Sequence, residues 1–216
     1  IRDHCVTGVQ TCALPIFEAL AVLRVRSACD PIMVKFQHDE MHTTAVAAMV
    51  AIGHLPPLLD GLRSENSQTR LGALTAIRRL ADVEALPALI SAFNVSDQNE
   101  REKIVRAYAS IGIEAHHQLI DALSDSAKSV QLAALQGLAL DSSETLMLRL
   151  IDMASNQDPD VRVAVLDAMQ RFSDGRVVAP LAAALEDDDS RVALQAKRSL
   201  DHLESVVARK GTSSDQ

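Results

Sequence analysis

The chain has 216 residues, of which 48% are hydrophobic, and its formal net charge at pH 7 is −8. With no tryptophan, one tyrosine and four phenylalanines, its core must come from Ala, Leu, Val and Ile, as in closely packed helices. The interspersed acidic charge argues against a nucleic-acid surface, and no run approaches the roughly eighteen apolar residues of a membrane span.

The N-terminal segment differs in character from the rest of the chain. Residues 6–16 (VTGVQTCALPI) resemble the translation of a common sequencing-library adapter. We therefore expect residues 1–16 to be an artefact and the native N-terminus to be missing, so that the absence of a signal peptide does not bear on location. Separately, we expect the protein to be cytoplasmic. Cys5 and Cys12 then leave the cysteine count, so Cys29 stands alone as a small core residue without a disulfide partner.

Residues 17–54 predict an irregular leading repeat. Met41, Ala45, Ala48 and Met49 form one helical stripe that ends at Gly53. A first helix must lie within 17–36, where FEALAVLRVRSA favours a helix but Pro31 interrupts it. We expect this repeat to be degraded or truncated.

Two histidines in this segment have a spacing that can hold a metal ion. His38 and His42 stand at i and i+4, but the Glu between them is third rather than second, unlike the zinc-protease motif, and no third ligand is evident. His116 and His117 fall in an expected turn. The sequence also lacks a Gly-rich phosphate loop and a Gly-x-Ser-x-Gly motif, so we expect no metal, no cofactor and no catalytic residue.

From residue 55 onward the sequence is self-similar with a period of about 31 residues. An apolar pair recurs in a short first helix, and its leading residues are Leu58, Leu89, Leu119, Leu150 and Leu181. A second helix follows each, with a buried stripe at offsets 0, 4, 7 and 8. Its first column is Thr69, Glu100, Val130, Val161 and Val192, and its second is Ala73, Ile104, Ala134, Val165 and Ala196. Polar turns between the paired helices supply capping oxygens.

These columns resemble the short HEAT repeats of the phycobilisome (PBS) lyase type. The resemblance rests on a proline near the first helix (Pro57, Pro87, Pro180), an acidic turn, and a Val-Arg pair that is best kept at Val161-Arg162. It implies an all-α, right-handed α-α superhelix, an armadillo-type α-solenoid of about five to six helical hairpins. The repeats are expected at about 17–54, 55–85, 86–115, 116–146, 147–177 and 178–206, followed by a polar tail at 207–216.

Three arginines share one position at the start of the second helix: Arg70, Arg101 and Arg162. They could form a ligand-binding ladder. We favour a structural role between repeats, in which each guanidinium binds turn carbonyls or an acidic residue of the neighbouring repeat.

The resemblance also implies a concave face lined by the second helices. Outward positions on these helices carry Arg78, Arg79, Arg106, Arg171 and Arg198. We expect this face to bind another protein through an acidic or mixed-charge surface, so that the chain is a bacterial-type scaffold or adaptor rather than an enzyme; a merely solvated face is the alternative. Two further alternatives rest on resemblance: an enzyme subunit similar to the bilin lyases, and a DNA-repair protein similar to HEAT-like alkylbase glycosylases, whose groove must be positive.

Overall fold

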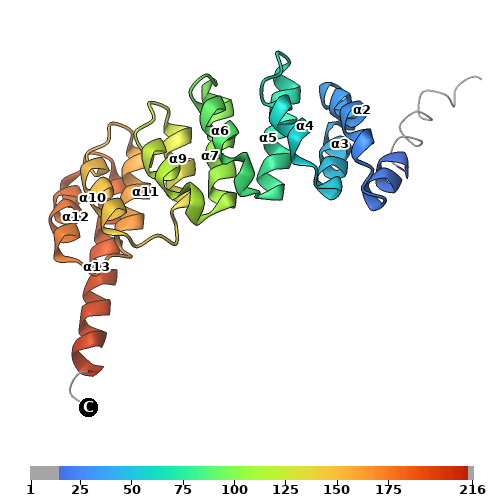
Figure 1. The fold of residues 1–216 in the computed structure, drawn as a ribbon. Helices are drawn as coiled ribbons and strands as arrows, with labels where there is room; N and C mark the ends of the chain where they lie inside the picture. The colour runs from blue at the N-terminus through green and yellow to red at the C-terminus, as the bar shows by residue number, and fades with distance from the viewer. Residues whose placement is uncertain (1–14, 214–216) are drawn as a thin grey trace, which may run out of the picture. The chain divides into compact units, whose positions relative to one another are not determined.

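The computed structural model describes residues 15–213, which fold into helices joined by turns (Figure 1). Most of the adapter-like segment, residues 1–14, therefore lies outside the described residues. The chain divides after Gln118 into two compact units, unit 1 and unit 2, which we describe separately.

Unit 1 consists of helical hairpins in which a short first helix precedes a longer second helix. The second helices α3, α5 and α7 pack side by side, and the first helices α4 and α6 pack against α5 and α7. After a helix over residues 15–22, the elements are η1 (Arg26–Ala28), α2 (Cys29–Val34), η2 (Lys35–Gln37), α3 (Asp39–Ile52), α4 (Leu55–Gly61), α5 (Ser67–Leu80), η3 (Val83–Ala85), α6 (Leu86–Phe93), α7 (Gln98–Ile111) and η4 (Ile113–Ala115).

Unit 2 continues the same pattern, with α9, α11 and α13 as its layer of second helices and α10 and α12 packed against α11 and α13. Its elements are α8 (His116–Ala122), which begins in unit 1, α9 (Lys128–Gly137), α10 (Glu144–Met153), α11 (Pro159–Met169), η5 (Gly175–Val177), α12 (Val178–Ala183), η6 (Ala184–Glu186) and α13 (Ser190–Ser213). The all-α solenoid expected from the repeat is confirmed.

The core follows the predicted columns. The first two columns of the second-helix stripe are buried in all five repeats, and the leading residues of the apolar pairs are also buried. Their following residues are not, since Ile90 is 37% exposed. In the last repeat Leu185 is 44% exposed, because α12 ends at Ala183 and the 3₁₀ turn that follows turns Ala184 into the core instead.

The leading repeat is more regular than its sequence indicated. Pro31 does not interrupt a helix: it lies in the first turn of α2, where a backbone N–H has no intrahelical acceptor and its loss is harmless. Cys29, Ile32 and Met33 of α2 and Phe36 of η2 are buried. This short first helix therefore packs against α3 as its counterparts do further along the chain.

The polar turns cap the second helices, as their sequences predicted. Side-chain oxygens of Asn66, Asp97 and Asp158 accept backbone N–H hydrogen bonds at the starts of α5, α7 and α11, at 2.9 to 3.0 Å. At the ends of α3 and α7, Gly53 and Gly112 have φ of +68° and +91°, a region that favours glycine. The caps thus define the length of each second helix.

The C-cap of α5 offers a test of this backbone chemistry, because a non-glycine residue occupies it. Ala81 is exposed and has φ of +51°, where a Cβ costs about 1–2 kcal/mol. We expect Ala81→Gly to raise the unfolding free energy by about 0.5–1 kcal/mol, after allowing for the greater freedom of glycine in the unfolded chain. Urea denaturation followed by circular dichroism measures it; Ala51→Gly, at an exposed site inside α3, should lower stability by a similar amount.

The last helix is longer than expected. We predicted a polar tail from residue 207, but α13 continues to Ser213. Within the described part of the chain, no helix has both the length and the apolar character needed to cross a membrane.

Candidate functional site

The second-helix layer of unit 1 contains a small cleft between α5 and α7. It has a volume of about 80 Å³ and is lined by Leu74, Thr75, Arg78, Lys103 and Arg106. We call it the α5–α7 cleft. Its apolar lining residue is Leu74, which is 2% exposed, and its charged lining residues come from both helices. The cleft therefore combines one apolar side chain with three cationic side chains.

The second-helix layer of unit 2 has a larger groove, of about 340 Å³, between α9 and α11. We call it the α9–α11 groove. Its lining is mainly apolar with a polar rim: Leu132, Leu135, Gln136, Ala139, Ala164, Asp167, Ala168, Gln170 and Arg171. Asp167 Oδ1 accepts hydrogen bonds of 3.0 Å from the amides of Gln170 and Gln195, so the carboxylate is held in place on the rim. The volume of this groove is several times that of the α5–α7 cleft.

The five arginines predicted on the partner-binding face have different environments. Arg78 and Arg106 line the α5–α7 cleft, and Arg79 and Arg198 do not; Arg78, Arg79 and Arg198 are all exposed, and Arg106 is half-buried. Arg106 also donates to Glu102 Oε1, at 3.0 and 3.1 Å. Of the five arginines predicted to share one face, two therefore lie together in one cleft of unit 1.

Arg171 lines the α9–α11 groove and is also engaged within the fold. Its guanidinium is half-buried and donates to the carbonyl oxygen of Ala168 in α11 and to those of Leu138 and Ala139, just beyond the C-terminal end of α9. Burial lowers the pKa of Arg171, while Asp141 and Asp167 oppose that effect. A cation at a helix C-terminus satisfies free carbonyls and the helix dipole, so this arginine stabilises unit 2.

Arg70 links neighbouring repeats of unit 1. Its Nη1 donates to the carbonyls of Ser64 and Glu65 in its own turn, at 2.7 and 2.9 Å. Its Nε and Nη2 both lie 2.7 Å from Oε1 of Glu100, which begins the stripe of the next second helix. The pairing explains why a glutamate at a column otherwise filled by apolar or small residues can be buried.

Arg162 makes the corresponding link in unit 2. It donates to the carbonyls of Asn156 and Gln157 and forms a bidentate pair with Asp187 of the next repeat, at 2.7 and 2.8 Å. The two side chains are only 16% and 13% exposed. The hydrogen bonds from Arg162 hold the pKa of Asp187 below its usual range, and the pKa of Arg162 is raised in turn.

The other members of this column vary the same arrangement. Arg101 donates to the carbonyl of Ser96, at 3.1 Å. Where the sequence has Gln131, its Nε2 donates to the carbonyl of Asp125 and its Oε1 accepts from Asn156 of the next repeat, at 2.8 and 3.4 Å. The fourth residue of α5, α7, α9 and α11 thus binds a carbonyl of its own turn, and in α5, α9 and α11 it also reaches the following repeat.

A second series of ion pairs, which the sequence reasoning missed, joins the starts of the second helices in unit 2. Lys128 lies 3.1 and 2.8 Å from carboxylate oxygens of Asp158 and Asp160, and Arg191 lies 2.6 Å from Asp160 and 2.8 Å from Asp189. The bonds from Arg191 lower the pKa of Asp189 to about 2. The recurring Asp-x-Arg spacing was the sequence signal: Asp174 and Arg176 pair in the same way at η5.

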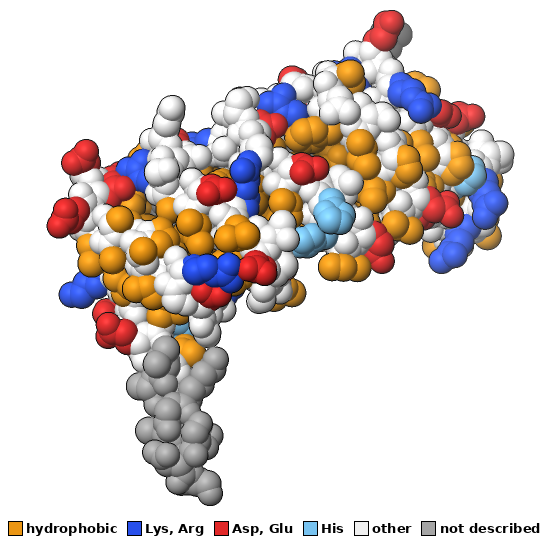
Figure 2. Space-filling view, turned by 60° about the vertical axis from the view of Figure 1, so that its left-hand side comes forward, with side chains coloured by type: hydrophobic (Ala, Val, Ile, Leu, Met, Phe, Trp, Pro, Cys, Tyr) orange, Lys and Arg blue, Asp and Glu red, His pale blue; other side chains and the backbone are white. Residues whose placement is uncertain are grey.

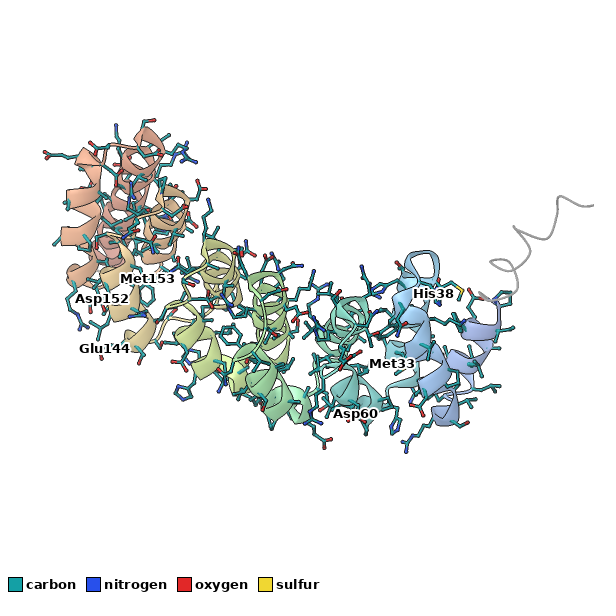
Figure 3. The ribbon with its side chains drawn as sticks, turned by 90° about the horizontal axis from the view of Figure 1, so that it is seen from above. Met33, His38, Asp60, Glu144, Asp152 and Met153 are labelled. Atoms are coloured by element: carbon teal, nitrogen blue, oxygen red, sulfur yellow. The ribbon has the colours of Figure 1, made fainter. Side chains whose placement is uncertain are left out.

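The histidine pairs lie apart from these grooves. His38 is exposed at the N-terminal end of α3 (Figure 3), while Nδ1 of His42 lies 2.9 Å from the carbonyl oxygen of Phe36. His116 and His117 occupy the first turn of α8, rather than the turn that we expected. No cluster of three potential metal-ligating residues occurs among the side chains that the structure describes, which do not include residues 39–40 and 207–213.

Charge on the molecular surface is mixed. Figure 2 shows acidic and basic side chains interspersed over the visible face, with hydrophobic side chains between them. Exposed apolar residues on the first helices include Leu148 and Val178, at 46% and 45% exposure. Isolated exposed apolar side chains are ordinary on a protein surface, so these residues by themselves do not indicate a binding site.

Comparisons with known proteins agree with this architecture. Residues 116–201 match the family of HEAT repeats. A HEAT-like repeats protein from the archaeon Thermococcus onnurineus NA1 is 14% identical, with a TM-score of 0.55 over 93% of this chain and 97% of that one. An engineered protein is 21% identical, with a TM-score of 0.50 over 88% and 96% of the two chains.

Two other findings add no functional argument. A chain from the complex of CpcE and CpcF of phycocyanin lyase from Nostoc sp. PCC7120 is 19% identical over 94% of this chain and 91% of that one, with a TM-score of 0.44. No curated protein matches the sequence. At these identities structural likeness shows the fold alone. The family match and the stacked hairpins together identify the chain as a HEAT-repeat protein with an α-solenoid fold.

Proposed function

We propose that this protein is a binding scaffold that holds an extended segment of another protein against its second helices, and that it has no catalytic role of its own. The observation that carries the proposal is the α9–α11 groove. It offers about 340 Å³ on the outer side of two adjacent second helices. A site of this size with an apolar lining and few polar groups suits a side chain and its flanking backbone.

The lining of the groove supports a peptide more than a compact polar ligand. Ala164 and Ala168 leave space on α11, where bulky side chains would fill it. Gln136 is exposed, and among the described residues its amide has no hydrogen-bond partner, so it can pair with a peptide group. Binding energy would then come from one or two buried anchors and a few backbone hydrogen bonds.

The test uses a phage-displayed library of random peptides selected on immobilised protein. We expect the wild type to enrich peptides, and Ala164→Arg, which fills the groove, to weaken their binding about tenfold or more, equivalent to about 1.4 kcal/mol. The matched control is Ala182→Arg at an exposed position on the first helix α12, which should bind within about twofold of wild type. Circular dichroism checks that both variants remain helical.

Two results would overturn the proposal. One is failure of the wild type to select any peptide; the other is equal binding by wild type and Ala164→Arg. The same preparation is also mixed with a linear tetrapyrrole, whose absorption spectrum should stay unchanged. A spectral shift would favour an activity like that of the bilin lyases, and salt-sensitive binding to duplex DNA would favour a DNA-repair role.

A further inference from the structure

Positive charge is concentrated in two adjacent helices of this acidic protein. Helices α5 and α7 contain six Lys and Arg residues and two Glu residues. The rest of the chain has 15 Lys and Arg against 27 Asp and Glu. α5 itself has three arginines and no acidic residue. Helices α5 and α7 are therefore a basic part of a chain whose net charge is −8.

Pairing within unit 1 leaves the basic charge of the α5–α7 cleft uncompensated. Arg70 is neutralised by Glu100, and Arg106 by Glu102. Arg78 and Lys103 have no hydrogen bond or ion pair with any of the described residues. Of the three cations that line the cleft, only Arg106 is thus paired with a carboxylate, and the hydroxyl of Thr75 already donates to the carbonyl of Leu71, at 2.8 Å.

The size of the cleft restricts which anionic groups can pair with its cationic side chains. A volume of about 80 Å³ is small beside the α9–α11 groove, and Leu74 supplies an apolar contact for a short aliphatic stem. Lys103 is half-buried, so its ammonium gives up part of its hydration, a cost that a bound anion offsets. Guanidinium and ammonium groups that line the same cleft match a carboxylate.

We propose that the α5–α7 cleft is a carboxylate subsite, which takes the side chain of a Glu or Asp in a protein segment bound to unit 1. Arg78 and Lys103 bind the carboxylate, and Leu74 packs against the methylene groups. This inference rests on the proposed function and specifies its partner as a segment with at least one acidic side chain. The net negative charge of the rest of the protein repels other acidic surfaces, so the cleft also orients the segment.

The experiment compares peptide selection on wild type with selection on a cleft variant, Arg78→Gln/Lys103→Gln. The matched control for the single change Arg78→Gln, which is tested alongside, is Arg79→Gln; it also removes one positive charge, from the next residue on α5 but outside the cleft lining. We expect wild type and Arg79→Gln to enrich peptides with Glu or Asp, and the cleft variant to select peptides without that enrichment. A selected peptide and its Glu→Gln version are then titrated by fluorescence anisotropy.

Either change alone, Glu→Gln in the peptide or the double change in the cleft, should weaken binding about five- to tenfold at low salt. Together they should weaken it little further, because each removes the same interaction. The effect should shrink at about 0.5 M salt, where exposed charges are largely screened.

The outcomes separate this inference from the proposed function. If wild type selects no peptides, the proposed function fails. If wild type selects peptides without acidic enrichment, or the cleft variant keeps that enrichment, the carboxylate subsite is wrong and the scaffold proposal stands. A phosphoserine peptide or a single-stranded oligonucleotide that binds the cleft more tightly than the Glu peptide would also overturn it, in favour of a phosphate site.

Discussion

Phe36→Ala should lower the unfolding free energy of unit 1 by about 3–5 kcal/mol, the usual cost of deleting a buried phenyl ring. Phe36 has no exposed surface, and it packs in η2 against α3 and α5. Because Gly72 of α5 approaches the ring closely, the cavity would lie between the leading repeat and the next one. Urea denaturation followed by circular dichroism measures the change.

Gly72 provides the partner for a double-mutant cycle. A Cβ built at Gly72 would lie 2.4 Å from Cδ2 and 2.7 Å from Cγ of Phe36. In wild type, Gly72→Ala should therefore destabilise the protein by about 1–2 kcal/mol, because overpacking exceeds the helix-propensity gain of about 0.5–1 kcal/mol. In Phe36→Ala the same change should become stabilising, because the ring is gone and only the propensity gain remains.

Gly61→Ala is the matched control for this cycle. Its Cβ would lie 2.5 Å from Cε of Met33 and 3.1 Å from Cβ of Ala73. The Met33 side chain (labelled in Figure 3) is flexible at that end and can move aside, and Ala73 need shift only by a few tenths of an ångström. We expect its effect to be within about 1 kcal/mol in both backgrounds. An unchanged sign for Gly72→Ala after removal of the ring would contradict the proposed packing of the leading repeat.

Arg162→Ala should destabilise unit 2 by about 2–4 kcal/mol. The change leaves the largely buried Asp187 carboxylate unpaired and frees the carbonyls of Asn156 and Gln157. Arg162→Gln should cost less, since Gln131 shows that a glutamine at this position still reaches a turn carbonyl. Arg149→Ala, at a half-buried arginine on α10, tests whether loss of any arginine has the same effect.

The same pair predicts a pH dependence with a definite sign. The pKa of Asp187 is lowered in the folded protein by its bonds from Arg162, so the ionised carboxylate stabilises the fold. That stabilisation is complete above the unfolded pKa of about 3.9 and is lost as the pH falls through the lower folded value. The difference in unfolding free energy between wild type and Arg162→Gln should therefore be constant from pH 7 to about 5 and shrink below about 4. A difference that grows in acid would contradict this assignment.

Surface ion pairs should behave differently from the Arg162–Asp187 pair. The pairs from Lys128 and Arg191 to Asp160 are about half-exposed, so each contributes little in solution and is weakened by salt. The buried pair, the carbonyl contacts and the apolar stripe therefore hold successive repeats together. Among the described residues, Arg78 and Lys103 of the α5–α7 cleft take no part in these contacts.

The architecture could be predicted from the sequence because the same pattern of buried positions recurs in each repeat. Ala73 and its counterparts are buried in every repeat, as the 3.6-residue period predicted, since helical geometry alone decides which positions share a face. The capping roles of Asn66, Asp97 and Asp158 were equally local and equally predictable. The same local reasoning failed at Pro31, because it treated a proline as a helix breaker without knowing that α2 begins only two residues earlier.

Side-chain partners across repeats depended on the tertiary structure. Arg78 and Arg171 are both arginines near the ends of second helices, yet Arg78 faces the α5–α7 cleft and Arg171 binds the carbonyls at the end of α9. Helical periodicity gives the direction of a side chain about its own helix, but the distance to an atom thirty residues away follows from how the hairpins stack. The sequence could therefore predict which residues build the solenoid, and only the packed repeats decide which charges are satisfied within it and which remain for a partner.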